Sequence, residues 1–262
     1  MLKNITLGQY FPGNTIIHRL DPRGKIICML LYITAVFLAD TLFQMGVVAL
    51  FFLCMVRISA VKFRLLFRGL RPLIIIFSLT AVMNLFFTPG EALVTFWRLT
   101  ITREGLLRAT IFLSRISLMV MGSFLLTYTT SPMALTDGLE KLLAPFKKLK
   151  LPVHELAMIM SMALRFVPTL IEETDKIIKA QKARGADFES GNVLSRAKAL
   201  VPIMIPLFIS AFRRADELAN AMEARCYHGG EGRTRMRKLQ LHVQDLWAGI
   251  VCIALVGVVL WV

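Results

Sequence analysis

Long apolar stretches, nearly free of charged side chains, constrain this chain more than any other feature. They cover residues 26–56, 72–87, 109–128 and 246–262. A helix rises ~1.5 Å per residue, so one helix over the first stretch would be about 46 Å long, more than the ~30 Å hydrocarbon core of a bilayer. We therefore divide that stretch at a turn near Asp40. The sequence predicts an all-α membrane protein with about five transmembrane helices.

The basic residues are distributed as in a membrane protein. The formal net charge is +14, and a strongly basic domain can bind the backbone of a nucleic acid. Here, however, Lys and Arg flank the apolar stretches, and eighteen of them lie between residues 129 and 245. Loops on the cytosolic side of a membrane carry this excess. We therefore expect the lipid bilayer as a partner, no nucleic acid, and a cytosolic N-terminus and middle segment.

The chain divides into three parts. Residues 1–128 hold the N-terminal transmembrane helices, residues 129–240 the middle segment, and residues 241–262 a C-terminal transmembrane helix. The middle segment mixes apolar and charged residues with a helical period, which predicts amphipathic helices. We expect three long helices on the cytosolic side: one over 131–150, one from Pro152 to Gly185, and one from Ser195 to Cys226.

Several local signals make narrower predictions. Asp21 and Pro22 are typical of a helix start, where Asp accepts a backbone N–H bond and Pro presets φ. Pro168 should kink or break the helix that contains it. Residues 92–107 are interpreted as an interfacial segment with Trp97 as a headgroup anchor. Arg115 lies in an apolar stretch, and we interpret it as a structural arginine paired with its neighbours.

Two helices of the middle segment end in nearly the same tripeptide, Ala183-Arg184-Gly185 and Ala224-Arg225-Cys226. The two arginines are 41 positions apart, and each has an Ala four residues and an Asp nine residues before it. A cation at a helix C-terminus is favoured by the macrodipole, which would suffice to explain either arginine alone. The repetition favours a shared role, because small neighbours leave each guanidinium free to enter a partner's groove and pair with carboxylates.

The chain lacks the motifs of catalysis and of autonomous transport. The apolar stretches contain no carboxylate suited to a proton or sodium relay, once Asp40 is placed in a turn. There is no GxxxxGK[ST] loop for ATP and no HExxH or GxSxG motif. The four Cys and four His residues show no metal-ligand spacing. We therefore expect a non-catalytic protein without a cofactor or a metal.

Three groups of residues together resemble the transmembrane T component of energy-coupling factor (ECF) transporters, a branch of the ABC superfamily. The resemblance extends over essentially the whole chain and is closest to the shared type of T component, which serves several substrate-binding subunits. It rests on Gly8-Gln9-Tyr10-Phe11-Pro12-Gly13 with His18-Arg19-Leu20-Asp21-Pro22-Arg23, on Arg165-Phe166-Val167-Pro168 with Ala183-Arg184-Gly185, and on Met222-Glu223-Ala224-Arg225-Cys226-Tyr227.

The resemblance implies a mechanism in a prokaryotic cell membrane. In that family, two Ala-Arg-Gly motifs cap coupling helices, and each motif docks on one of two cytosolic ABC ATPases. Arg184 would engage one ATPase and Arg225 the other, and ATP hydrolysis would reorient a vitamin-binding S component in the membrane. Cys226 departs from the usual Gly, which puts the C-cap geometry of its helix in question, because Cys tolerates a positive φ less well.

Three other functions remain as alternatives at the level of the sequence. An autonomous secondary transporter would lack its relay carboxylates, and a membrane-embedded enzyme would lack a convergent acid and base. A conventional ABC permease usually presents a short coupling helix between spans, whereas here the last two spans are separated by all of residues 129–245.

Overall fold

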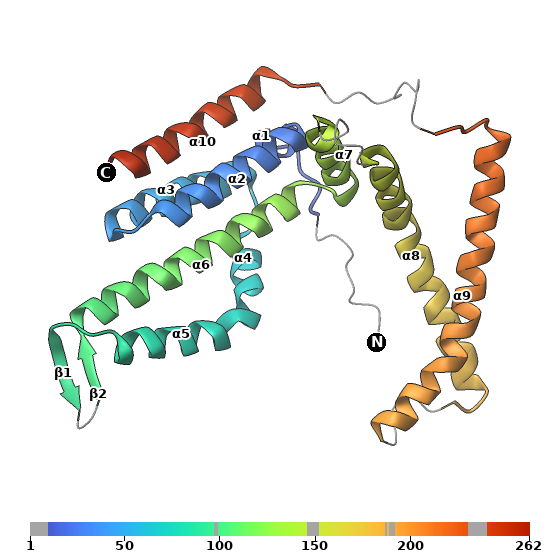
Figure 1. The fold of residues 1–262 in the computed structure, drawn as a ribbon, viewed down its shortest axis with the longest axis horizontal. Helices are drawn as coiled ribbons and strands as arrows, with labels where there is room; N and C mark the ends of the chain where they lie inside the picture. The colour runs from blue at the N-terminus through green and yellow to red at the C-terminus, as the bar shows by residue number, and fades with distance from the viewer. Residues whose placement is uncertain (1–9, 97–98, 146–151, 187, 189–191, 230–239) are drawn as a thin grey trace. The chain divides into compact units, whose positions relative to one another are not determined.

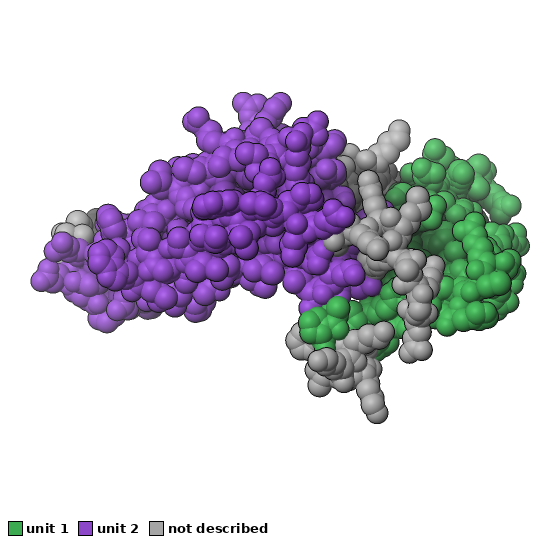
Figure 2. Space-filling model, turned by 90° about the horizontal axis from the view of Figure 1, so that it is seen from above, with its two compact units in different colours: residues 1–7, 143–237 green, residues 8–142, 238–262 purple. Residues whose placement is uncertain are grey.

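The structure, a computed structural model, describes residues 10–96, 99–145, 152–186, 188, 192–229 and 240–262. The chain forms two compact units, coloured separately in Figure 2. The first unit, here called the membrane framework, comprises residues 8–142 and 238–262. The second, comprising residues 1–7 and 143–237, is built on two long helices that we call the helix pair.

The membrane framework contains most of the secondary structure (Figure 1). In chain order its elements are α1 Ile16–Arg19, α2 Pro22–Leu38, α3 Leu42–Ser59, α4 Phe63–Leu70, the 3₁₀ helix Arg71–Leu73, α5 Ile74–Phe87, β1 Ala92–Phe96, β2 Leu99–Thr102, α6 Arg103–Thr129, α7 Pro132–Leu143 and α10 Val243–Trp261.

Local capping explains where the first helices begin. The side chain of Asp21 accepts a hydrogen bond from the N–H of Arg23 at 2.9 Å, and Pro22 is the first helical residue of α2. The predicted helix start is therefore confirmed. The turn predicted near Asp40 is also confirmed, because Thr41 and Gln44 form a capping box that starts α3.

The core of the membrane framework lies between helices that are far apart in sequence. The last helix, α10, packs along α2, and α6 packs against α2, α3, α4 and α5. Val36, Val48 and Leu66 are completely enclosed in this core. Tight packing extends to α7, where a Cβ at Gly138 would come within 2.9 Å of the Pro22 ring. The structure thus joins α7 to the framework.

The segment interpreted as interfacial contains a β-hairpin followed by the start of a helix. Strands β1 and β2 pair antiparallel, with Phe96 opposite Leu99. The β-branched and aromatic residues of this stretch favour a strand. Helix α6 begins at Arg103, earlier than the predicted span, because the hydroxyl of Thr102 accepts a hydrogen bond from the N–H of Gly105. Trp97 lies outside the described residues.

The helix pair consists of α8 (Val153–Ala183) and α9 (Val193–Ala224). Gln181 of α8 donates a hydrogen bond to the carbonyl of Pro202, and Arg214 of α9 forms a salt bridge with Glu173 at 2.6 Å. The two helices therefore run antiparallel (Figure 1). Helix α8 continues through Pro168, with fifteen residues on each side, so of the two predicted outcomes, a kink or a break, the break does not occur.

Among the residues that the structure describes, five helical stretches are long and apolar enough to cross a membrane: Leu42–Ser59, Phe63–Phe87, Arg103–Thr129, Val153–Ala183 and Val243–Trp261. The all-α membrane class with additional helices is thus confirmed, with the short hairpin as an addition. These five candidate membrane spans are not the same five that the sequence predicted. Helix α2 has only 17 residues, whereas α8, predicted as a cytosolic-side helix, qualifies with the lowest mean hydropathy of the five, 1.2.

Candidate functional site

The C-terminus of α8 ends in a Schellman motif built on Arg184 and Gly185. The N–H of Gly185 donates to the carbonyl of Lys182 and the N–H of Ala186 to that of Gln181, both at 3.0 Å. Gly185 has φ +85°, the left-handed conformation that this motif requires. The predicted end of the helix at Gly185 is therefore confirmed, and Arg184 is the residue at the C-cap.

The C-terminus of α9 repeats this geometry without a glycine. The N–H of Cys226 donates to the carbonyl of Glu223 at 2.8 Å, and the N–H of Tyr227 donates to that of Met222 at 3.0 Å. Cys226 has φ +54°, so it adopts the conformation that Gly185 has in the other motif. The question raised by Cys226 is thereby answered: the C-cap is kept, and Arg225 occupies it as Arg184 does.

Both arginines are exposed at the surface of the helix pair. All residues of the two tripeptides are exposed: Ala183, Arg184, Gly185, Ala224, Arg225 and Cys226. Within the described part of the chain, neither guanidinium forms an ion pair. Their charges therefore contribute little to internal packing, while the planar guanidinium remains available for a bidentate contact with a carboxylate.

The antiparallel packing places the two arginines at opposite ends of the helix pair. Arg184 follows the end of α8, beside the first half of α9, where Gln181 contacts Pro202. Arg225 lies at the far end of α9. At ~1.5 Å per residue, the intervening part of α9 measures on the order of 35 Å. The sequence predicted two similar helix ends, but only the fold brings them to the two ends of one body.

A second polar site, in the membrane framework, was missed from the sequence. The ammonium group of Lys25 donates to the carbonyls of Thr129 (2.9 Å) and His18 (3.2 Å) and to the hydroxyl of Thr130 (3.2 Å). The three donors of this buried lysine are therefore used at the point where α6 ends. Lys25 immediately precedes an apolar stretch, and that position was the only signal in the sequence.

Asp245 completes this polar cluster from the other end of the chain. One carboxylate oxygen accepts a hydrogen bond from the N–H of Asp21 and the other from the N–H of His242, both at 2.7 Å. Asp245 therefore joins the start of α10 to the start of α2, 224 residues away. Nearby, burial lowers the pKa of His18, whose ring contacts the Thr15 hydroxyl and the Phe11 carbonyl.

Arg115 has the structural role predicted for it. Its guanidinium forms a salt bridge with Asp40 at 2.8 Å and a hydrogen bond to the carbonyl of Ala39. The charge also lies 5.9 Å from the centre of the Phe37 ring. This arginine of α6 therefore holds the turn between α2 and α3 and is no candidate for substrate binding.

No group of three or more His, Cys, Asp or Glu residues that could hold a metal ion occurs among the residues that the structure describes. The described residues of the helix pair present exposed cations and exposed apolar side chains. Such a surface can bind other macromolecules. In the helix pair that surface includes Leu156 and Ile159 of α8 and Phe208 and Phe212 of α9, all exposed.

Comparison with known proteins identifies the family. A model of the CbiQ family, described as cobalt transport protein, matches residues 13–236. The chain is 54% identical over 255 residues to the energy-coupling factor transporter transmembrane protein EcfT of Acidaminococcus fermentans, covering 97% of this chain and 95% of that relative. The chain belongs to the family of energy-coupling factor transporter transmembrane proteins.

Other members of this family align over a similar extent. The EcfT protein of Thermosediminibacter oceani is 53% identical, with 95% of this chain and 94% of the relative covered. That of Bacillus subtilis is 47% identical, with 95% and 92% covered. As an energy-coupling factor transporter transmembrane protein, the chain is a multi-pass membrane component of a transporter, in agreement with its apolar helices.

Proposed function

We propose that this chain is the non-catalytic scaffold through which two ABC ATPases drive a vitamin-binding S component. Arg184 docks on one ATPase and Arg225 on the other. The observation that carries the proposal is the repetition of one Schellman-capped arginine at each end of the antiparallel helix pair. Two equivalent contacts at a separation of tens of ångströms suit a partner that itself consists of two related subunits.

Docking through these arginines is energetically reasonable. Arginine is enriched among interface hot spots, where truncation costs ≥ ~2 kcal/mol, because its planar donors satisfy a carboxylate in two directions. Neither guanidinium has to break an ion pair within the described residues before it binds. A glutamate at either position would place like charges together, so charge reversal should abolish the contact.

The apolar surface of the helix pair supplies the second half of the mechanism. Exposed apolar residues on both helices offer a face for a membrane partner, and the salt bridge between Glu173 and Arg214 ties the helices together. When the ATPases close on ATP, a movement at the arginine ends would be carried along α8 and α9 to the S component. That component holds the vitamin and reorients in the bilayer.

The coupling role is tested by charge reversal in the complete complex. We expect the Arg184→Glu, Arg225→Glu double variant to insert normally and to lose vitamin uptake and transport-linked ATP hydrolysis more than tenfold. The measurement is ATP-driven uptake by proteoliposomes. Lys179→Glu with Arg213→Glu, which makes the same charge change at exposed positions of the same helices, is the control and should transport normally. Normal uptake by the first variant would overturn the proposal.

The proposed orientation has its own test. The excess of Lys and Arg in the middle segment supports a cytosolic location for the N-terminus and the helix pair. Cys226 is exposed and therefore reports on the side of the membrane that it faces. With the chain expressed without the ATPases, we expect a membrane-impermeant maleimide to label it in inside-out vesicles and not in intact cells, with Cys226→Ser as the control. Labelling in intact cells would refute this orientation.

A further inference from the structure

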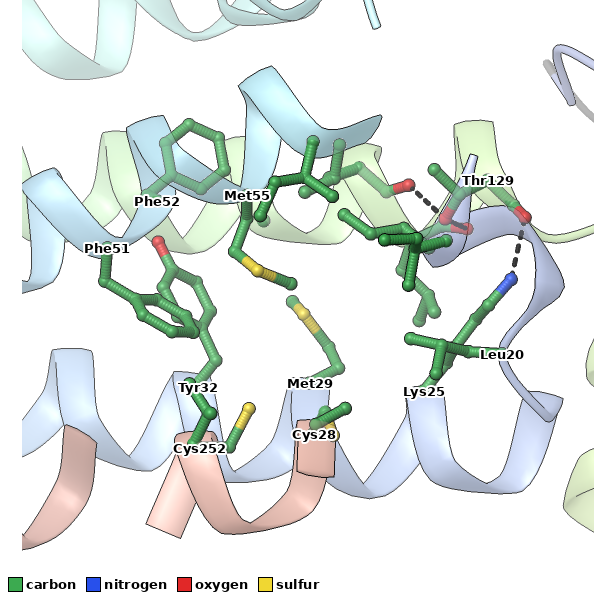
Figure 3. A pocket seen from close by; sticks show the side chains of 18 of the residues that line it. Leu20, Lys25, Cys28, Met29, Tyr32, Phe51, Phe52, Met55, Thr129 and Cys252 are labelled. Atoms are coloured by element: carbon green, nitrogen blue, oxygen red, sulfur yellow. Dashed lines mark hydrogen bonds between the residues drawn. The ribbon is translucent and has the colours of Figure 1, made fainter. Parts of the chain in front are cut away.

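The segment around helix α4 of the membrane framework is basic and has no carboxylate near it in the sequence. No Asp or Glu occurs between Asp40 and Glu91. The buried Lys25 is held by the carbonyl of Thr129 (Figure 3), but the cations of this segment are different. Within the described residues they form no ion pair, so the chain leaves their charge uncompensated. All five are exposed: Arg57, Lys62, Arg64, Arg68 and Arg71.

This basic segment connects two apolar helices. Helix α3 ends at Ser59, and the uncharged α5 begins at Ile74. The 3₁₀ helix Arg71–Leu73 separates α4 from α5, where Pro72 has no backbone N–H to continue an α-helix. Figure 1 accordingly shows α4 turning away from the direction of α5. Cations that flank apolar membrane helices lie at the membrane surface, so α4 is placed at the level of the phospholipid headgroups.

Helix α4 docks on the framework through one face. On this face Leu66 is fully enclosed and Leu70 is buried. Between them, a Cβ at Gly69 would collide with the Phe124 ring of α6. The helix therefore lies too close to α6 for a side chain at residue 69, and this contact fixes which face of α4 points away from the framework.

The face that points away is cationic, and an apolar stripe lies beside it. Arg64 and Arg68 are each two residues from Leu66, which places them about 200° around a helix with ~3.6 residues per turn. Phe63 and Phe67 lie on the flank between the two faces and are 37% and 55% exposed. Their ring centroids are 5.4 Å apart. Helix α4 thus exposes a pair of aromatic rings next to a pair of guanidinium groups.

This pattern is typical of a helix that lies in the plane of the membrane interface. The rings of Phe63 and Phe67 can enter hydrocarbon while the neighbouring guanidinium groups meet phosphate, which they bind with two parallel hydrogen bonds. We propose that α4 binds anionic phospholipids through Arg64, Arg68 and Arg71. Basic clusters on amphipathic helices select anionic headgroups. The exposed rings favour lipid over a soluble acidic protein, because lipid covers both stripes at once.

The proposal is tested by fluorescence quenching with brominated lipids. The reporter is Phe67→Trp, in a full chain that also has Trp97→Phe, Trp247→Phe and Trp261→Phe. The chain is reconstituted in phosphatidylcholine vesicles, and phosphatidylglycerol or phosphatidylcholine brominated on the acyl chain is added at the same low mole fraction. We expect about a threefold or greater preference for phosphatidylglycerol in quenching efficiency, and a smaller preference at high salt. Equal quenching by the two lipids would overturn the proposal.

Charge-matched variants test whether the preference comes from α4. Arg64→Gln with Arg68→Gln should remove it. Arg103→Gln with Arg108→Gln, the same charge change at exposed positions in the first turns of α6, should keep it. Arg64→Lys with Arg68→Lys should also keep it, because the charge remains. A preference that survives Arg64→Gln with Arg68→Gln would place the anionic lipid elsewhere and refute the proposal.

The complete complex tests whether lipid or protein covers this face. Photoactivatable phosphatidylglycerol should crosslink to residues 63–71 in the complex, as identified by mass spectrometry. Crosslinks from a partner subunit in its place would assign the face to a protein and refute the proposal. The quenching measurement needs no ATPase, so its failure would leave the coupling role of the helix pair untouched.

Discussion

The interior of the membrane framework and the ends of the helix pair differ in whether their charged side chains have partners within the chain. In the framework, Lys25, Asp245 and Arg115 find their partners within the chain, through bonds that join residues up to 224 positions apart. In the helix pair, Arg184 and Arg225 are exposed at helix ends and form no ion pair within the described residues. These three framework residues are paired within the chain, whereas the helix pair exposes two cations that we propose bind other molecules.

The largest loss of stability should come from removing a buried charge from the membrane framework. Lys25→Met would leave the Thr129 carbonyl without its donor and would leave the buried Asp21 and Asp245 without a nearby ammonium. Breaking a buried polar cluster in this way costs on the order of 3–5 kcal/mol. We expect a much lower unfolding temperature for the full chain in detergent, measured by tryptophan fluorescence.

The matched change for Lys25→Met is Lys62→Met, which removes the same charge from an exposed position in the framework. Its unfolding temperature should equal that of the unaltered chain. An unchanged unfolding temperature for Lys25→Met would show that the framework does not depend on its internal charge.

A smaller effect should appear at the two helix ends, where the residue after the arginine differs. A left-handed conformation costs a non-glycine residue roughly 1–2 kcal/mol. Cys226→Gly should therefore increase protection of the amides that close the α9 cap, by about fivefold or more, while Gly185→Ala should reduce protection at the α8 cap. Hydrogen exchange with mass spectrometry measures both.

Transport should be retained in Cys226→Gly, because the arginine and its cap remain in place. The space around Gly185 is open, so the effect of Gly185→Ala is one of backbone conformation alone. Equal protection in the altered and unaltered caps would contradict the explanation based on φ.

Local signals in the sequence predicted the elements well. Asp21 with Pro22 marked the start of α2, and Gly185 marked the end of α8, because each of these features involves neighbours in the chain. At Pro168 the sequence left a kink and a break open, and the absence of a break has an energetic reason. A proline costs a helix interior about 3 kcal/mol, and a helix that continues for fifteen residues on each side can absorb that loss.

Contacts between residues that are far apart in the chain could not be predicted from the sequence. Lys25 and Asp245 each border an apolar stretch, but nothing in the pattern tells which helices lie side by side. The same limit applies to the candidate site. The tripeptides ending in Gly185 and Cys226 were predicted as equivalent ends, yet their placement at opposite ends of the helix pair depends on the antiparallel packing of α8 and α9.

The central claim is that each arginine engages a different ATPase, and binding of the two ATPases, added separately to the full chain in nanodiscs, tests it most directly. Arg184→Glu should weaken binding of one ATPase by about 30-fold or more and leave the other unchanged, and Arg225→Glu should show the reverse selectivity. If both variants bind both ATPases normally, or if both weaken the same one, the assignment of one arginine to each ATPase is wrong.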